Sequence, residues 1–352
     1  MSLESIRRQI DEVDSEILKL LKRRVELASA IGELKRKLSM PISDPAREAN
    51  ALARMVSEAR AQGLDAELTA LTFKAIMGLC KKVQERTRVA FLGPRGTFSE
   101  EAALKAFLSE GALLEPLATL SGVFDAVERG SVDYGVVPIE NSIEGFVGET
   151  LDLLTASDVK VCGEVEVRVN LNLIAKPGTK LEDISVVLSH PQALSQCRSF
   201  LRRVLHNVEV RECSSTAEAV KKAVSSDRVA AIGSSLAAVI YGGEVLMRNI
   251  EDFKDNCTRF LIVGQKKIER AIGCKTSVIF EVPNTPGSLY KALSPFALRG
   301  INLACIVSRP VKDKPWNYMF YLEFEGDDEK CLEELKERAS YVKILGTFGK
   351  LN

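Results

Sequence analysis

The chain has 352 residues, 46% of them hydrophobic, so we expect two or three domains of ordinary globular composition. Lys plus Arg and Asp plus Glu both number 48, and this zero net charge argues against a general nucleic-acid binder. The eight cysteines contain no C-x-x-C pair and only two histidines accompany them, which argues against a structural zinc site and favours reduced thiols. We find no signal peptide and no apolar run that could span a membrane, so we expect a cytoplasmic protein.

The first 86 residues are predicted to be helical throughout. Over residues 6–38 apolar side chains recur at alternating steps of four and three, the pattern of a helix buried along one stripe. A helix over residues 3–39 would be about 50 Å long at 1.5 Å per residue, which is too long for one small domain to cover. We therefore expect it to pack against a second copy of the chain. Asp44 before a proline, and Asp65, mark the starts of two further helices.

Arg24 interrupts this apolar stripe. An unpaired charge in such a position is costly, so an anion should meet it. One interpretation is an ion pair with Glu48 or another acid that only fixes the register of the helices. However, Lys35 lies on the same helix face, Arg47 adds a further charge, and Gln84 is polar on another apolar stripe. A buried cluster of like charge repels itself, which favours a binding site for a small dianion.

Residues 1–86 resemble chorismate mutases of the all-helical class. The matching positions are Arg7, Arg24, Lys35, Asp44, Arg47, Glu48 and Gln84. The resemblance implies a Claisen rearrangement of chorismate to prephenate, which needs no nucleophile, metal or organic cofactor. It implies that Arg24, with Arg7 contributed by a partner chain, holds the two carboxylates, and that Lys35 and Gln84 donate to the ether oxygen. Glu48 and the backbone near Asp44 would receive the ring hydroxyl, with Arg47 supporting. Cys80 stands where the family often has serine and is a weaker donor to a substrate carboxylate.

Residues 88–264 alternate short apolar runs with amphipathic stretches, which predicts an α/β domain with a mostly parallel sheet. Small polar residues end five of the predicted strands, at 93–99, 138–142, 189–192, 212–216 and 231–235. Each cluster alone is explained by helix capping, because Thr97 with Glu100 and Ser215 with Glu218 both fit a capping box. Their convergence on one sheet edge favours a cleft that binds carboxylates.

The same region resembles prephenate dehydratases through GPRGTFS, VVPIENS, SHPQ and TRF, in the family's order. The resemblance implies a two-lobed cleft similar to periplasmic-type binding proteins, where prephenate loses hydroxide and CO2 to leave phenylpyruvate. It implies that Thr258 is the proton donor beside Asn141 and Gln196. Glu140 and His190 are stronger acids nearby, and a purely structural hydrogen bond is the alternative for each of these residues. The further substrate-binding candidates are Thr97, Ser99, Ser142, Ser189, His190, Ser215, Thr216 and Arg259.

A polar linker over residues 265–274 precedes a unit in the order βαββαβ, which is typical of a ferredoxin-like sandwich. Residues 275–352 resemble the ACT regulatory domain through PGSLY and VSRP. The resemblance implies side-by-side pairing and feedback inhibition by phenylalanine. The candidate effector residues are Asn284, Pro286, Gly287, Ser288, Leu289, Ser308 and Arg309. Val307 replaces a glutamate that relatives often carry. Tyrosine or tryptophan as the effector, or a packing module without a ligand, are the alternatives.

Taken together, these patterns predict a multidomain enzyme with segments 1–86, 88–264 and 275–352. It would convert chorismate to prephenate and prephenate to phenylpyruvate in phenylalanine synthesis, as a dimer or dimer of dimers, with no cofactor, metal, nucleic acid or membrane partner. The alternative is a non-catalytic sensor of aromatic ligands on the same scaffold, with degenerate active sites. The presence of Arg24, Lys35, Gln84 and Thr258 argues against that alternative.

Overall fold

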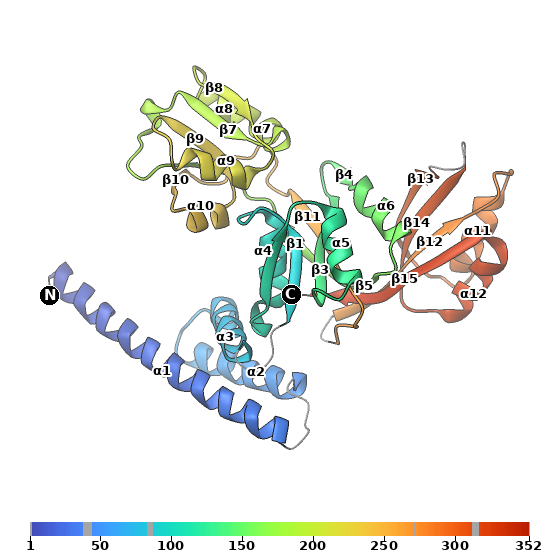
Figure 1. Ribbon diagram of the computed structural model, residues 1–352, viewed down its shortest axis with the longest axis horizontal. Coiled ribbons are helices and arrows are strands. Elements are labelled where there is room, and N and C mark those ends of the chain that lie inside the picture. The colour runs from blue at the N-terminus through green and yellow to red at the C-terminus, as the bar shows by residue number, and fades with distance from the viewer. Residues whose placement is uncertain (1, 38–43, 83–86, 270–271, 312–316, 352) are drawn as a thin grey trace. The chain divides into compact units, whose positions relative to one another are not determined.

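The computed structural model describes residues 2–37, 44–82, 87–269, 272–311 and 317–351 (Figure 1). The chain forms two compact units, one of Met1–Arg88 with Phe107–Leu113 and the other of Val89–Ala106 with Leu114–Asn352. Over the ranges given, none of the helices has both the length and the apolar character that crossing a membrane requires.

The first unit is built on three helices, α1 (Leu3–Lys37), α2 (Pro45–Ala61) and α3 (Ala66–Lys81). The predicted caps are confirmed, since Asp44 accepts a hydrogen bond from the Arg47 N–H at 3.0 Å and Asp65 accepts one from the Leu68 N–H at 2.8 Å. The predicted apolar stripe of α1 lies open within this chain, and Leu20, for example, is 66% exposed. The short 3₁₀ helix η1 (Leu108–Glu110) belongs to the same unit.

The second unit begins with an α/β lobe whose sheet has the strand order β5-β11-β3-β1-β2. Strands β1 and β3 are parallel, but β11 runs antiparallel to both of its neighbours, because the chain returns through it after visiting a second lobe. Strands β1, β3 and β5 therefore run in one direction, as predicted, and β11 is the exception that makes the sheet mixed. The bounds are β1 Arg88–Leu92, α4 Phe98–Phe107, β2 Leu113–Leu117, α5 Leu120–Glu128, β3 Tyr134–Asn141, β4 Gly145–Phe146, α6 Gly148–Ala156, β5 Lys160–Arg168 and β11 Cys257–Gly264.

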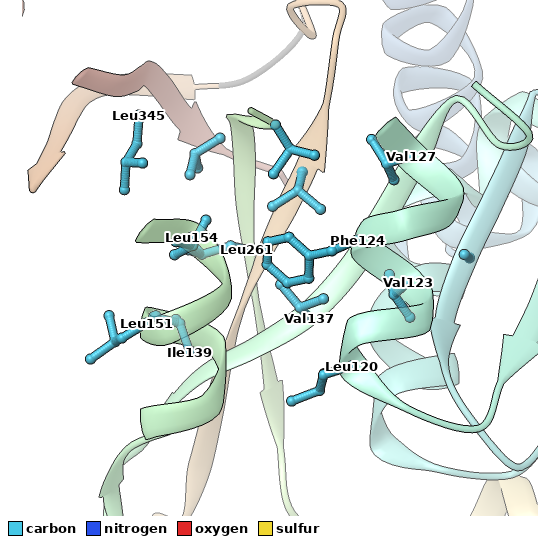
Figure 2. Packing of buried hydrophobic residues seen from close by; sticks show 14 of the residues in the cluster. Leu120, Val123, Phe124, Val127, Val137, Ile139, Leu151, Leu154, Leu261 and Leu345 are labelled. Atoms are coloured by element: carbon cyan, nitrogen blue, oxygen red, sulfur yellow. The ribbon is translucent and has the colours of Figure 1, made fainter. Parts of the chain in front are cut away.

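Helices α5 and α6 cover one face of this sheet, as Figure 2 shows. Phe124 of α5 and Leu154 of α6 pack against Val137 of β3 and Leu261 of β11, and each of these side chains is at most 1% exposed. Burying one such side chain stabilises the fold by about 1.5–3 kcal/mol. This core fixes the strand pair β3–β11, and that pair carries the central residues of the larger cavity described below.

The second lobe has a five-stranded sheet in the order β10-β6-β9-β7-β8. Strands β7, β8 and β9 are parallel, so their carboxyl ends and the helices that follow them share one edge. The bounds are β6 Asn172–Ala175, η2 Leu181–Asp183, β7 Val186–Ser189, α7 Pro191–Gln196, α8 Arg198–Val204, β8 Glu209–Glu212, α9 Thr216–Ala223, β9 Val229–Gly233, α10 Ser235–Tyr241 and β10 Glu244–Met247.

The remaining residues of this unit confirm the predicted βαββαβ order, with an antiparallel sheet ordered β13-β14-β12-β15. Strand β15 also pairs in parallel with β5 of the first lobe, where Lys350 lies opposite Glu164, so the two sheets are continuous. We call this part, residues 272–351, the effector domain, after the role that the sequence predicts for it. The bounds are β12 Ile272–Glu281, α11 Ser288–Leu298, β13 Leu303–Pro310, β14 Tyr318–Glu325, α12 Glu329–Arg338 and β15 Tyr341–Lys350.

Candidate active sites

A cavity of about 260 Å³ lies among the three helices of the first unit, and we call it the helical cavity. It brings together six of the residues that the sequence predicted for a dianion site, namely Arg24, Lys35, Asp44, Arg47, Glu48 and Cys80. Apolar side chains of α1, α2 and α3, among them Ile31 and Met77, complete its wall.

Positive charge dominates the helical cavity. Among the residues that the structure describes, four cationic and two acidic side chains line it, which gives a net charge of about +2. Glu48 pairs with Lys81 at 2.8 Å and not with Arg24, so the interpretation of an Arg24–Glu48 pair is wrong. Arg24 donates to the Ile76 carbonyl at 3.4 Å and contacts Cys80 Sγ at 2.7 Å, and within the described part of the chain it meets no carboxylate. The cavity therefore suits a guest with two negative charges.

Arg7, Gln84 and Lys81 stand apart from these six residues. The sequence assigned Arg7 to a partner chain, and this stays a prediction. Arg7 is exposed on α1 and does not line the cavity, because 17 residues of helix separate it from Arg24 by about 25 Å. Gln84 lies outside the described residues. Lys81 was not predicted, although it follows Met77 and Cys80 at helical spacing and so shares their face.

A cavity of about 1020 Å³ lies in the second unit and is lined by both α/β lobes; we call it the cleft. Eight of the predicted dehydratase residues line it, namely Thr97, Ser99, Asn141, His190, Gln196, Ser215, Thr216 and Thr258. The predicted convergence of polar strand ends is thus seen. Capping and lining the cleft are not exclusive roles, since the Ser215 hydroxyl accepts from the Glu218 N–H at 3.0 Å and His190 Nδ1 accepts from the Gln192 N–H at 3.4 Å.

Thr258 and Asn141 lie opposite each other on β11 and β3. The Asn141 side-chain oxygen accepts from the backbone N–H groups of Ile143 and Glu144 at 3.0 and 3.1 Å, which fixes the orientation of the amide. Its nitrogen therefore donates to Thr258 Oγ1 at 2.9 Å. Because Thr258 accepts this bond, its own hydroxyl hydrogen is left for a ligand in the cleft.

Asn256 joins this pair to the second lobe and was not among the predicted residues. It is 1% exposed, accepts from Asn141 Nδ2 at 2.7 Å and donates to Gln196 Oε1 at 2.8 Å. Side chains two residues apart on an extended chain lie on the same face, so Asn256 shares a face with Thr258. This spacing could have identified Asn256 from the sequence. Two cations of the cleft wall, Arg95 and Lys221, were also missed.

Arg259 was predicted to bind substrate, and the structure corrects this. Its side chain leaves β11 on the face opposite to Thr258, where Nη1 lies 2.7 Å from Glu323 and 3.1 Å from Glu164, and Nη2 lies 3.1 Å from Glu140. Burial opposes its charge, but these carboxylates, Glu323 above all, hold the pKa of Arg259 above its ordinary value. The same contact removes Glu140 from the candidate acids of the cleft and leaves His190.

Two predicted serines are likewise structural. Ser189 is fully buried and donates to the Ile232 carbonyl at 2.7 Å. The Ser142 hydroxyl accepts from the Cys257 N–H at 3.0 Å, which ties the end of β3 to the start of β11. Neither serine lines the cleft, because each satisfies a backbone group beside it.

The predicted effector residues lie in two places in the effector domain. Asn284, Pro286, Gly287, Ser288 and Leu289 form the loop and first turn of α11, with Gly287 as the N-cap at a φ of 81°. Ser308 is exposed on β13. Arg309, by contrast, donates to Asp152 at 3.0 Å and to the Gly148 carbonyl at 3.4 Å, both on α6. Its guanidinium is therefore engaged with the first lobe, which the sequence did not predict.

Three family models match in succession along the chain. Chorismate mutase type II matches residues 6–85, prephenate dehydratase matches residues 89–268 and the ACT domain matches residues 276–338. The bifunctional chorismate mutase/prephenate dehydratase of Aquifex aeolicus (strain VF5) is 41% identical to this chain, over 99% of this chain and 98% of that protein. The chain belongs to this bifunctional family. It is a chorismate mutase and a prephenate dehydratase, and the alternative of a non-catalytic sensor is not favoured.

Two solved structures resemble the chain over its dehydratase and effector parts. A prephenate dehydratase from Arthrobacter aurescens, in complex with L-Phe, is 32% identical with a TM-score of 0.69, and the match covers 75% of this chain and 90% of that one. A protein described as a novel type of quorum quenching acylase, GqqA, is 29% identical with a TM-score of 0.68, covering 75% of this chain and 98% of that one.

Proposed function

We propose that the helical cavity is the mutase active site, that the cleft is the dehydratase active site, and that residues 1–86, 88–264 and 275–352 carry the mutase, dehydratase and effector functions. The observation that carries the first assignment is the net charge of about +2 on the wall of the helical cavity, which matches the two carboxylates of chorismate. The second assignment rests on the hydrogen-bonded series Thr258, Asn141, Asn256 and Gln196 in the cleft.

In the helical cavity the chemistry asks only for positioning and electrostatics. Chorismate rearranges within one molecule, so holding it in the reactive chair supplies much of the rate enhancement. Arg24 holds one carboxylate by a forked pair of hydrogen bonds, and Lys35, with Gln84, donates to the ether oxygen as its bond breaks. Lys81 forms an ion pair with Glu48, so Glu48 can accept a hydrogen bond from the ring hydroxyl without adding an uncompensated negative charge. Asp44, Arg47 and Cys80 complete the wall.

In the cleft the ring carboxylate of prephenate leaves as CO2 while the ring hydroxyl leaves as water. The electron pair of the breaking carbon–carbon bond enters the ring as the carbon–oxygen bond breaks, and one proton is taken up. Thr258 donates a hydrogen bond to the departing hydroxyl, and Asn141 holds Thr258 in place. Aromatisation drives the step, so a weak acid suffices. His190 Nδ1 accepts from a backbone N–H, which leaves Nε2–H to face the ligand.

A second copy of the chain completes the mutase site in this proposal. The exposed apolar stripe of α1, with Ile10 at 54%, Leu20 at 66% and Leu27 at 59%, is too large to leave in water. Packing against a partner's α1 covers it and brings the partner's Arg7 toward the second substrate carboxylate. A dimer, or a dimer of dimers paired also through the effector domains, is the assembly that this supports.

Phenylalanine is the proposed effector and binds at the loop Asn284–Leu289 and at Ser308. The helix N-terminus at Ser288 offers backbone N–H groups to an amino-acid carboxylate. The L-Phe complex of the Arthrobacter dehydratase supports this choice of ligand.

All eight cysteines are unpaired, which supports a reducing, cytoplasmic location.

A direct assay tests the two assigned activities. The purified chain is given chorismate, and absorbance is followed for its loss and, after alkali, for phenylpyruvate. We expect both signals without added metal or organic cofactor. Loss of chorismate without phenylpyruvate, also when prephenate is supplied, would contradict the assignment of the cleft.

A further inference from the structure

The cleft wall carries little charge for a site that receives a dianion. The described residues that line it include one arginine, Arg95 of the first lobe, one lysine, Lys221 of the second lobe, and one acid, Glu218. Glu218 is already compensated, since Lys222 pairs with it at 2.8 Å. We propose that Arg95, oriented by Glu100, and Lys221 bind the side-chain carboxylate of prephenate, the one that phenylpyruvate retains. This inference rests on the proposed function of the cleft.

The position of Arg95 is fixed by hydrogen bonds to its Nε and to its backbone carbonyl, which suits an arginine that binds a carboxylate. Glu100 is 1% exposed, and one of its oxygens accepts from Arg95 Nε at 2.9 Å while the other accepts from the Gly96 N–H at 2.5 Å. The Arg95 carbonyl accepts from the Tyr241 hydroxyl at 2.8 Å. The backbone and Nε are thereby fixed, while the side chain remains 62% exposed and forms part of the cleft wall. In this proposal its two Nη groups meet the ligand. Two parallel N–H groups suit a carboxylate.

Lys221 adds a positive charge to the cleft wall from the second lobe. It lies on α9, whose first turn carries Ser215 and Thr216, and all three residues line the cleft. Its neighbour Lys222 is engaged with Glu218, so Lys221 is the lysine of this helix that is left to meet a ligand. An ammonium on a flexible stem adds attraction without demanding a fixed geometry.

The chemistry decides which carboxylate these cations hold. The ring carboxylate must give up its charge as it leaves as CO2, so a cation bound to it would stabilise the substrate more than the transition state. The side-chain carboxylate keeps its charge throughout the reaction, so a cation that binds it stabilises the bound substrate and the transition state equally. The apolar part of the wall, with Phe98, Leu117 and Leu171, is left for the ring.

The test compares Arg95→Ala and Lys221→Ala with Lys176→Ala, a matched surface lysine that pairs with Asp227 away from the cleft. We expect KM for prephenate to rise about tenfold or more in the first two, with kcat changed by less than about threefold. Product inhibition by phenylpyruvate should weaken by the same factor as KM rises. A kcat on prephenate near the wild-type value reports that the cleft is correctly folded. The KM of Arg95→Lys, which keeps the charge but loses the fork, should fall between those of the wild type and Arg95→Ala.

Glu100 acts through Arg95, so Glu100→Gln should raise KM and the phenylpyruvate inhibition constant together. In the double variant with Arg95→Ala, Glu100→Gln should raise KM no further than Arg95→Ala does alone. An unchanged KM in Arg95→Ala overturns the proposal. So does a raised KM with unchanged phenylpyruvate inhibition, because the cations would then hold the ring carboxylate. A wild-type chain that makes no phenylpyruvate would instead refute the assignment of the cleft itself.

Discussion

The Nη1 atom of Arg259 lies 2.8 and 2.7 Å from the two carboxylate oxygens of Glu323, so the residue next to Thr258 is bound by the effector domain. Strand alternation places the two neighbours on opposite faces of β11, with Thr258 in the cleft and Arg259 against β14. The Tyr321 hydroxyl donates to the same Glu323 at 2.5 Å. These contacts join β14 directly to the strand that carries the proposed proton donor.

Helix α6 is a second link between the effector domain and the first lobe. Arg309 of β13 donates to the Gly148 carbonyl at the start of α6 and to Asp152 in its middle. Lys343 of β15 donates to the Leu154 and Thr155 carbonyls at 2.9 Å, and to that of Ser157, at its end. Desolvation lowers the pKa of the half-buried Lys343 from its ordinary value.

Glu323→Gln should weaken the response to phenylalanine. The variant keeps the shape of the side chain but loses the charge that holds Arg259, so the two domains should move more independently. We expect the phenylalanine concentration for half inhibition to rise severalfold, with KM for prephenate near the wild-type value. Glu325→Gln, at an exposed position of the same strand, is the matched control. Identical inhibition curves for the two variants would contradict this route.

Glu101 should make stability depend on pH. Burial raises its pKa from 4.5 to about 7, against the opposing hydrogen bonds from Ser234 and the Leu236 N–H, and Glu100 adds a smaller rise. Between pH 4.5 and 7 the folded chain holds a proton that the unfolded chain has lost, so stability falls as pH rises through this window. The largest loss is on the order of 3 kcal/mol.

Glu101→Gln imitates the protonated carboxyl and should remove that dependence. The difference in Tm between the variant and the wild type should therefore grow in favour of the variant from pH 5 to pH 8. Thermal unfolding followed by circular dichroism at four pH values measures it. Parallel Tm curves would show that Glu101 has an ordinary pKa.

Lys81→Ala should impair the mutase alone. It removes the partner of Glu48 at 2.8 Å and lowers the net charge of the helical cavity from about +2 to about +1. We expect KM for chorismate to rise about tenfold, since one charge-assisted contact is affected. Lys82→Ala, the exposed neighbour that does not line the cavity, should leave KM unchanged. An equal effect of both substitutions would point to general helix destabilisation.

Leu20→Glu should lower the mass of the assembly in solution. Leu20 lies on the apolar stripe of α1 and is 66% exposed within one chain, so a charge there opposes contact with a second copy. Leu18→Glu is a matched control, because Leu18 is 67% exposed but lies off the stripe. Light scattering on a sizing column distinguishes them. A wild-type chain that is already monomeric would rule out the proposed dimer.

The sequence predicted what local patterns encode. Heptad spacing located α1, side-chain caps located α2 and α3, and polar strand ends located the cleft. It could not show which carboxylate meets Arg259, because Glu140, Glu164 and Glu323 come from three strands far apart in the chain. Lys81 was missed for a related reason. A lysine on a helix is usually exposed to solvent, and only the structure shows that this one pairs with Glu48.

Thr258 tests the proposed dehydratase chemistry. Thr258→Ala removes the hydroxyl that Asn141 holds at 2.9 Å, and we expect kcat on prephenate to fall by about 10²-fold or more with mutase activity unchanged. Thr258→Ser keeps the hydroxyl and should retain most of the activity. Equal losses in the two variants would assign Thr258 a packing role.

The central claim is that a cationic cavity in the helical unit, separate from the cleft, rearranges chorismate. Arg24→Ala, assayed for both activities on one preparation, tests this most directly. We predict that chorismate consumption is lost while phenylpyruvate still forms from supplied prephenate at the wild-type rate. Retained chorismate consumption, or an equal loss of both activities in a folded protein, would contradict it.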